Sequence, residues 1–510
     1  MARLPTGLIL AAPLAFALLA VLPGQDANWD LRNYHYWTGY AFLTGRHGFD
    51  DLVGQLPSFY NPTLDLPVYW LAQILPAKGV AFALGLVHGL NAPLLFLIAR
   101  RLLGSPWWAL VLALLGMTRA GALGELGAVM HDNVVSLGFL SALALIVTAR
   151  GMPSGRRALL AGLAMGLAVG LKLTTALYAV ALCLAFFVLE GAWRLRFERA
   201  FLFGLAVLAG YTVTGLHWNW HLWTSYGNPV FPLMNDLFQS PMALPKPYRE
   251  TGFLPKNLSE TLLFPFLFSD NGLRVGEADF RELAVAFAYL LVPVGAIWGL
   301  RRNGWEPKVR FLMLTLAIAY LLWLKMFAIY RYLIGIEMLT PLAILLALRT
   351  LPIAACHTTR TAVVLLALIA ATSRPPDWIH VPWGPRFIDI QLPPIDQPER
   401  TMVVMAGHEP SSFLIPAFPP AIPFLRIDSQ FTNPLETGNG FNARMKARID
   451  AHAGALLVLY YPDQLPDVVE KLEQVGLGLE ESACRPVTAN IAPGPFALCP
   501  AVRPPMGGKG

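Results

Sequence analysis

Long runs of apolar residues alternate with short polar segments over about the first 373 residues of the chain. Many of these runs reach or approach the ~20 apolar residues that an α-helix needs to cross a lipid bilayer. We therefore predict about eleven membrane-spanning helices, two of them shorter than a full span, over residues 6–22, 79–99, 107–118, 132–149, 157–171, 174–190, 200–216, 283–300, 310–327, 332–349 and 361–373. The composition agrees, because the 510 residues are 55% hydrophobic and only 14% charged. A mainly α polytopic membrane protein is the expected class.

The distribution of basic residues predicts how the chain is oriented in the membrane. They occupy alternate connections between the apolar runs, and such basic connections are usually cytoplasmic. This parity places residues 23–78, 118–131, 217–282 and the tail from about 374 on the extracytoplasmic side of a bacterial inner or plasma membrane. Much of the net charge of +6 lies in the basic connections, so it does not indicate a nucleic-acid partner. The basic residues are Arg100, Arg101, Arg150, Arg156, Arg157, Arg194, Arg196, Arg199, Arg301, Arg302, Lys308, Arg310, Arg349 and Arg360.

The composition changes to that of a soluble domain after a Pro-rich connector, SRPPDWIHVPWGP. TMVVMAG, PFLRID, ALLVLYY, LGLEESAC and FALCPAV are typical of strands, and FNARMKARIDAHAG and DQLPDVVEKLEQVG of helices. Residues 374–510 are therefore expected to form a small extracytoplasmic α/β domain, and residues 1–373 a transmembrane domain. The GHEP sequence after the first of these strands is compatible with a ligand loop and with an ordinary turn that starts a helix.

Two of the four cysteines, Cys484 and Cys499, fall in this polar tail. An extracytoplasmic location would permit a disulfide. The first lies at the end of one expected strand and the second within another, with a Pro- and Gly-containing stretch between them that can turn back. We expect the two to be bonded, the alternative being two unrelated buried thiols.

The two longest outer segments, 23–78 and 217–282, are rich in aromatic residues and prolines. Prolines at 57, 62 and 67 exclude a long helix in the first of them, so short helices along the membrane are expected. Long connections with an ordered composition usually have a functional role.

The stretch DANWDLRNYHYWTGY, residues 26–40, carries two carboxylates four residues apart, Asp26 and Asp30. On a helix this spacing places both on one face. Arg32, His35 and several aromatic residues surround them, which suits an acidic reaction centre beside a surface on which a sugar could stack. The alternative is an aromatic belt at headgroup depth with ordinary surface acids.

Other ionisable residues lie at the ends of apolar runs, where burial in a membrane costs about 2.5–3.5 kcal/mol each at the bilayer centre. By the predicted topology they share the outer face with Asp26 and Asp30, so together they indicate a site. Each alone is also compatible with a long side chain that reaches water. They are Glu125, His131, Asp132, Lys172, Lys325 and Arg331.

This combination resembles the GT-C superfamily of membrane glycosyltransferases, which take sugars from polyprenyl-phosphate carriers. DANWDLRNYHYW is similar to the acidic motif that follows the first span in that superfamily. HDNVVSLGFLSALAL is similar to its second acidic motif, AGLAMGLAVGLKLTT to a Gly-rich hairpin ending in Lys-Thr, and YRYLIGIEML to a late span opened by Arg-Tyr. The resemblance covers roughly residues 1–350. The first loop departs from better-known members because its acids are separated by three residues instead of forming an acidic doublet.

The resemblance implies transfer of a sugar to an acceptor hydroxyl with inversion. The acceptor must lose a proton, so the resemblance implies a carboxylate base in the first loop. We expect Asp30 to be this base, with Asp26 as the alternative, because Asp30 directly precedes the cluster from Arg32 to Tyr36. Lys172 and Arg331, assisted by Arg32, would stabilise the carrier phosphate. Asp132, with His131 or Glu125, would bind the acceptor or a divalent metal of unidentified type. The implied partners are a polyprenyl-phosphate sugar, a glycan, lipid or protein acceptor, and membrane lipids.

Two other classes compete with this interpretation. A lipid or polysaccharide transporter would also bury charged residues, but it more often shows two related halves with interrupted spans, which this sequence does not reveal. A membrane-anchored binding or assembly protein would have its active part in the tail.

Overall fold

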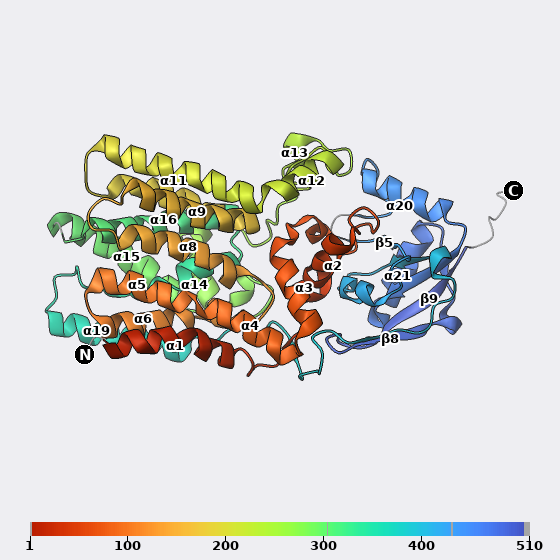
Figure 1. Cartoon of the computed structure of the whole chain (residues 1–510), viewed down its shortest axis with the longest axis horizontal. Helices are drawn as coiled ribbons and strands as arrows, with labels where there is room; N and C mark the ends of the chain where they lie inside the picture. The colour runs from red at the N-terminus through yellow and green to blue at the C-terminus, as the bar shows by residue number, and fades with distance from the viewer. Residues whose placement is uncertain (1–2, 303, 430–431, 504–510) are drawn as a thin grey trace. The chain divides into compact units, whose positions relative to one another are not determined.

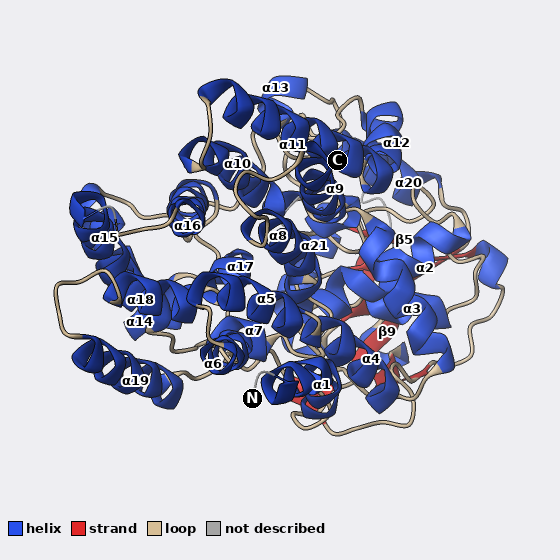
Figure 2. Cartoon of the chain, turned by 60° about the vertical axis from the view of Figure 1, so that its left-hand side comes forward, coloured by secondary structure: helices blue, strands red, loops and turns tan. Residues whose placement is uncertain are grey.

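The computed structural model describes residues 3–302, 304–429 and 432–503. The chain forms two compact units, each assembled from separate stretches of sequence. The first unit comprises Met1–Pro23, Ala81–His217 and Glu250–Trp378, and the second comprises Gly24–Val80, Trp218–Arg249 and Ile379–Gly510. Figure 2 shows that the structure is mainly helical, with the longer strands gathered in one sheet.

The first unit is a set of helices joined by short connections (Figure 1). Ser105 begins one of them by accepting a hydrogen bond from the Trp108 backbone N–H, as expected of a helix cap. Ser154 and Asn257 cap two more in the same way. The helices are α1 (Arg3–Leu19), α4 (Ala77–Gly89, which begins in the second unit), α5 (Asn91–Leu103), α6 (Pro106–Met117), α7 (Ala120–Gly124), α8 (Asp132–Val147), α9 (Gly155–Leu171), α10 (Ala176–Ala185), α11 (Trp193–Thr214), α14 (Leu258–Asp270), α15 (Ala284–Arg302), α16 (Pro307–Met326), α17 (Ile334–Glu337), α18 (Thr340–Leu348) and α19 (Ala355–Thr372).

The Gly-rich face of α9 explains its close packing on α11. A Cβ atom on Gly162 would lie 2.2 Å from the Phe203 carbonyl oxygen, and one on Gly166 would lie 2.1 Å from the Val207 carbonyl oxygen. Only glycine permits this approach, and four-residue spacing of small residues is a common device for packing helices in membranes. The sequence AGLAMGLAVG therefore sets the contact between these two helices.

Among the described residues, four helices are long and apolar enough to cross a membrane: Ala77–Leu103, Trp193–Thr214, Pro307–Met326 and Ala355–Thr372. A bent pair, Tyr330–Glu337 and Thr340–Leu348, would make a fifth, with an angle of 49° between its parts. Shorter apolar helices of 10–17 residues include Pro106–Met117 and Asp132–Val147. The prediction of about eleven spans is therefore not supported. Some predicted runs are longer than the helix they form; residues 132–149, for example, form α8 over only 16 residues, which extend about 24 Å against a hydrocarbon core of about 30 Å.

The second unit contains a mixed sheet. Its order is β3-β8-β9-β6-β4-β5, with β7 paired to β9. Strand β4 is parallel to both β5 and β6, whereas β9 is antiparallel to β6 and β8. The strands are β3 (Ile390–Gln391), β4 (Thr401–Met405), β5 (Phe424–Arg426), β6 (Ala455–Tyr460), β7 (Gly478–Leu479), β8 (Arg485–Ala489) and β9 (Phe496–Val502), accompanied by helices α20 (Gly440–Ala451) and α21 (Leu465–Gln474).

The core of the sheet explains the order of these elements. Val404 of β4, Val458 of β6, Met445 of α20 and Leu472 of α21 are all buried in one apolar cluster. Strand β4 is buried at all five positions, as expected of a central parallel strand. The α/β domain predicted for the tail is thus present, and Cys484 and Cys499 are joined in a disulfide, as the sequence predicts.

Two outer segments belong to the second unit rather than to the helical one. Arg46 donates hydrogen bonds to the Pro420 and Ile422 carbonyl oxygens at 2.8 and 2.6 Å. The Asp51 backbone extends the sheet beyond β5, through bonds to Phe424 and Arg426. The second unit thus combines the tail from Ile379 with residues 24–80 and 218–249, two segments that the prediction assigned to the domain of residues 1–373. Their helices are α2 (Tyr36–Thr44), α3 (Asp65–Ile74), α12 (Leu216–Tyr226) and α13 (Asn235–Phe238).

Candidate functional site

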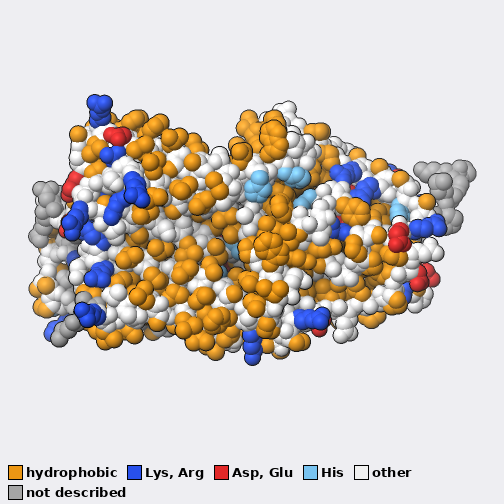
Figure 3. Space-filling view, in the orientation of Figure 1, with side chains coloured by type: hydrophobic (Ala, Val, Ile, Leu, Met, Phe, Trp, Pro, Cys, Tyr) orange, Lys and Arg blue, Asp and Glu red, His pale blue; other side chains and the backbone are white. Residues whose placement is uncertain are grey.

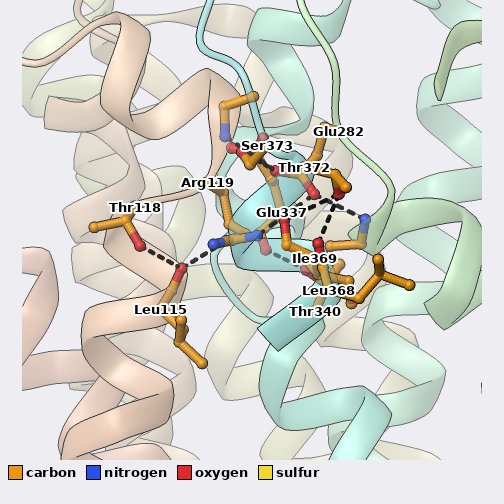
Figure 4. A network of polar contacts seen from close by, with 12 residues as sticks. Leu115, Thr118, Arg119, Glu282, Glu337, Thr340, Leu368, Ile369, Thr372 and Ser373 are labelled. Carbon is orange, nitrogen blue, oxygen red and sulfur yellow. Dashed lines mark hydrogen bonds and ion pairs between the residues drawn. The ribbon is translucent and has the colours of Figure 1, made fainter. Parts of the chain in front are cut away.

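A network of buried carboxylates holds the short helix α7 in the first unit (Figure 4). Glu337 accepts hydrogen bonds from the Gly121 and Ala122 backbone N–H groups at 2.8 and 3.0 Å. Glu282 accepts one from the Ala120 N–H at 3.1 Å and lies 3.6 Å from Arg119. These acids satisfy the N–H groups that the first turn of a helix leaves unpaired. The network therefore fixes the turn that ends at Glu125.

Glu125 follows α7 directly and is 1% exposed. Neither of its carboxylate oxygens has a hydrogen-bond partner among the described residues. Burial raises the pKa of Glu125 well above its usual range, and Asp132 acts in the same direction, while Lys172 and Arg331 oppose them. An unpaired buried carboxyl group is costly, so it indicates a functional group.

Glu125 and Arg331 line the same cavity, which encloses about 270 Å³ between atoms, some of it open to solvent. Tyr330 and Trp378 also border it. The Arg331 guanidinium lies 5.8 Å from the Trp378 ring centroid, within the range of cation–π attraction. A carboxyl group, a guanidinium and aromatic rings thus face one hollow of the first unit.

Lys172 lies at the end of α9 and forms an ion pair with Asp132, the first residue of α8. Its Nζ is 2.6 Å from Asp132 Oδ2 and 3.0 Å from the Met130 carbonyl oxygen. The Tyr332 ring connects this pair to Arg331, because Lys172 Nζ and Arg331 Cζ lie 5.3 and 5.8 Å from its centroid. The structure therefore brings together four of the predicted site residues, Glu125, Asp132, Lys172 and Arg331.

His131 and Lys325, also predicted from the sequence, differ in their surroundings. His131 is buried and has a left-handed backbone, with φ of 68°, directly before α8. Histidine is among the residues that adopt this region more often than most. Lys325 is exposed in the last turn of α16.

Because Asp132 forms an ion pair with Lys172, a metal ion bound at Asp132 would have to displace that lysine.

The acidic stretch of the first loop lies in the second unit, and its two acids do not share a helix face. Asp26 is in a short strand, β1 (Gln25–Asp26), paired with β2 (His380–Val381). It accepts hydrogen bonds from the Asn28 backbone and side chain. Asp30 begins the helical segment that continues through a π-helical turn, Leu31–His35. The prediction of a common face is wrong, because pairing with a distant strand keeps Asp26 extended.

Arg32 is engaged within the second unit. Its guanidinium forms an ion pair with Glu409, and its Nε donates to the Ala27 carbonyl oxygen at 3.0 Å. The side chain is 4% exposed. Arg32 therefore ties the acidic stretch to the GHEP loop, and binding a phosphate would require it to leave Glu409.

A second cavity, wholly within the second unit, is lined by aromatic rings and histidines. It encloses about 350 Å³, part of it open to solvent. Trp218 stacks on His221 with ring centroids 4.8 Å apart, and its Nε1 donates to the Phe59 carbonyl oxygen at 2.8 Å. Burial lowers the pKa of His47 to about 4, and His221 acts in the same direction. Aromatic rings, imidazoles and the carboxylates of Asp50 and Asp51 thus line this hollow together.

Several residues of these sites were not singled out from the sequence. Glu337 lies within the apolar run 332–349 and Arg119 directly follows the run 107–118, where the cost of burying a charge could have marked both. Glu282 and Trp378 carry no such signal, because they lie in polar segments. The described residues of the second unit also offer a possible metal-ligand set, His408, Asp428 and Asp467.

Comparison with protein-family models finds none that matches this chain, and comparison with curated proteins finds no match either.

Proposed function

We propose that this protein is an integral membrane glycosyltransferase that moves a sugar from a polyprenyl-phosphate carrier to an acceptor hydroxyl during assembly of a cell-envelope glycan. The observation that carries the proposal is the grouping of Lys172 and Arg331 around Tyr332, beside the carboxylates Asp132 and Glu125. Two cations are what a departing lipid phosphate requires, and carboxylates are the groups that accept the acceptor's proton.

In the proposed reaction, the acceptor oxygen forms a bond to the anomeric carbon while the bond from that carbon to the phosphate oxygen breaks. The electron pair of the broken bond remains on the carrier phosphate, where Lys172 and Arg331 stabilise the charge. The proton of the acceptor hydroxyl passes to a carboxylate. The displacement occurs in one step and inverts the anomeric centre, so no intermediate bonded to the enzyme is needed.

Two residues, Asp30 and Glu125, are candidates for the catalytic base. Asp30 follows from the resemblance of the first loop to the acidic motif of GT-C enzymes. Glu125 follows from geometry, because it lines a cavity with Arg331 and its oxygens have no hydrogen-bond partner among the described residues. Its raised pKa would favour a protonated carboxyl group before reaction, which suits an acceptor contact better than a base. Asp30 therefore remains the proposed base and Glu125 the proposed acceptor partner.

The proposed location is a bacterial inner or plasma membrane, with the second unit on the extracytoplasmic side. Figure 3 shows Lys and Arg side chains gathered at one end of the first unit, with hydrophobic side chains over its flanks. Exposed Arg150 lies in the connection before α9, and exposed Arg156 and Arg194 lie in the first turns of α9 and α11. A basic end is typical of the cytoplasmic side, and a disulfide in the second unit supports an oxidising compartment for it.

The direct test is incubation of the full chain, purified in detergent, with a panel of radiolabelled polyprenyl-phosphate sugars and envelope acceptors. Transfer of label to an acceptor, lost in Lys172→Gln and kept in Lys325→Gln, is the expected result. Movement of a labelled carrier across liposomes without transfer would instead support a transporter, the alternative function. If no carrier binds to the wild-type chain, the proposal is wrong.

A further inference from the structure

The three parallel strands of the second unit end at one edge of the sheet, and each is followed by a potential metal ligand. His408 follows β4, Asp428 follows β5, and Asp467 lies in the first turn of α21, which follows β6. Strand β4 lies between the other two, because the chain passes from β4 to β5 on one side and then crosses through α20 to β6 on the other. Open α/β sheets bind ligands in the crevice at such a switch point, outside the carboxyl ends of the strands.

The three side chains converge. One ligand atom from each, an imidazole nitrogen and two carboxylate oxygens, lies within 4.8 Å of the others. This spacing suits three atoms around one cation, whose bonds to nitrogen and oxygen are about 2.0–2.2 Å long. His408 belongs to the GHEP sequence, which is compatible with a ligand loop and with an ordinary turn.

The surroundings of Asp428 supply an independent sign of a ligand site. The residue is 4% exposed, and its Oδ2 is buried without a hydrogen-bond partner among the described residues. Its nearest ion-pair contact is His408 Nε2 at 3.7 Å, which is too long for a hydrogen bond. A buried carboxylate oxygen that faces an imidazole and a second carboxylate without being bonded to either has the surroundings of a metal ligand.

The loop that carries His408 is held in place by the sheet. Arg426, at the end of β5, donates a hydrogen bond to the Gly407 carbonyl oxygen at 2.6 Å. Gly407 has φ of +85°, and a Cβ there would lie 2.3 Å from Gln464 Oε1, which accepts a hydrogen bond from the Glu409 N–H. The loop is thus held by Arg426 of β5 and by Gln464, which follows β6, whereas the His408 side chain is 63% exposed and leaves an entry path from solvent.

We propose that His408, Asp428 and Asp467 bind a divalent transition-metal cation at the carboxyl edge of this sheet. One imidazole and two carboxylates suit Zn²⁺ or Mn²⁺ better than Ca²⁺, which prefers oxygen ligands alone. Three protein ligands leave positions open for water or for an anionic group. The proposal does not depend on the proposed glycosyltransferase activity.

A variant of Lys471 gives a further test of the proposal. The positive charge of Lys471 acts on Asp428, as do the charges of His408 and Arg426. If Asp428 is simply a structural acid, the positive charge of Lys471 stabilises its carboxylate. If it is a metal ligand, Lys471 competes with the cation. The variant Lys471→Gln should then bind metal several-fold more tightly.

The test is calorimetric titration of the purified full chain, freed of metal by chelation, with Zn²⁺, Mn²⁺ and Ca²⁺. We expect one Zn²⁺ or Mn²⁺ site in the wild type that is weakened at least about tenfold in His408→Ala, Asp428→Asn and Asp467→Asn. The matched controls His452→Ala and Asp463→Asn, which change the same residue types in the same unit, should bind as the wild type does.

His408→Ala keeps the test decisive if the aspartate variants fail to fold, since an exposed side chain contributes little to stability. Equal binding by the wild type and His408→Ala would overturn the proposal, and so would a site that prefers Ca²⁺. Weaker binding by Lys471→Gln would also count against it, because that lysine would then be supporting the fold of the site. Absence of sugar transfer would leave this result unaffected.

Discussion

Lys172 Nζ lies 2.6 Å from Asp132 Oδ2, although 40 residues separate the two in the sequence. The lysine ends α9 and the aspartate begins α8, so the pair is set by two helices that pack together. A lysine held in this way is already ordered before a phosphate arrives, and less conformational entropy is lost when it binds.

Replacing Lys172 by Gln should weaken binding of a polyprenyl-phosphate donor roughly ten- to a hundredfold, because a hydrogen bond to a charged group is worth about 1.5–3 kcal/mol. Donor affinity can be measured on purified protein by competition with a labelled carrier. Lys325→Gln, which removes an exposed lysine from the same unit, should have no effect. Unchanged affinity in Lys172→Gln would exclude the lysine from the phosphate site.

Asp30→Asn should abolish turnover while donor affinity and thermal stability stay near those of the wild type, because only the proton acceptor is lost. Glu125→Gln should retain measurable turnover and raise the KM for the acceptor. Single-turnover assays with preloaded donor separate the two effects. The reverse outcome, with Glu125→Gln inactive and Asp30→Asn active, would assign the base to the first unit.

The sequence predicts local elements well where pattern alone decides them. Strand β4 and helix α21 fall where TMVVMAG and DQLPDVVEKLEQVG predict them, since their apolar spacing is sufficient. The membership of 24–80 in the second unit could not be predicted. It depends on Arg46 and Asp51 bonding to residues that lie more than 370 positions away.

The site was predictable in part for a similar reason. The cost of burying charge singled out Asp132, Lys172 and Arg331 without knowledge of their contacts. The strand at Asp26 was missed because its partner, His380–Val381, lies beyond all of the apolar helices. The same spacing of acids that suggests a helix face is equally compatible with one acid in a strand and the other in a helix.

Glu337→Gln should destabilise the first unit by about 1–3 kcal/mol or more. Its carboxylate accepts from two backbone N–H groups and from the Tyr330 hydroxyl, and an amide cannot accept at every one of these positions. Thermal unfolding in detergent, followed by tryptophan fluorescence, measures the change. Glu306→Gln removes an exposed acid that pairs with Arg101 and should alter stability by less than about 0.5 kcal/mol. Equal melting of both variants would show that the α7 network does not stabilise the unit.

His47 should make the second unit sensitive to acid. Its pKa is lowered from 6.5 to about 4, chiefly by burial, and its Nε2 has no hydrogen-bond partner among the described residues. The unfolded chain therefore binds a proton more readily than the folded one between these two values. The stabilising contribution is complete above about pH 6.5 and is lost as the pH falls towards 4.

Melting temperatures measured from pH 7.5 to pH 4 should accordingly decline less in His47→Gln than in the wild type. His452→Gln, which changes another histidine of the second unit, should show the same dependence of melting temperature on pH as the wild type. A His47→Gln profile parallel to that of the wild type would show that His47 does not titrate in this range. His221, whose pKa is also lowered by burial, would contribute to any decline that remains.

Cys484 and Cys499 close a loop of 15 residues, and the bond should stabilise the second unit by about 3 kcal/mol in the chain-entropy model. In the variant Cys484→Ser/Cys499→Ser that unit should unfold at a lower temperature, while Cys356→Ser, which removes an exposed free thiol, should not change its melting temperature.

Labelling of intact cells with a membrane-impermeant thiol reagent tests the location of the same bond. Cys499 is fully buried, so Cys484 is the expected site of modification, and only after reduction. Labelling without reductant would contradict the disulfide in cells. Labelling that requires permeabilised cells would place the second unit on the cytoplasmic side, and the proposed extracytoplasmic transfer would then be wrong.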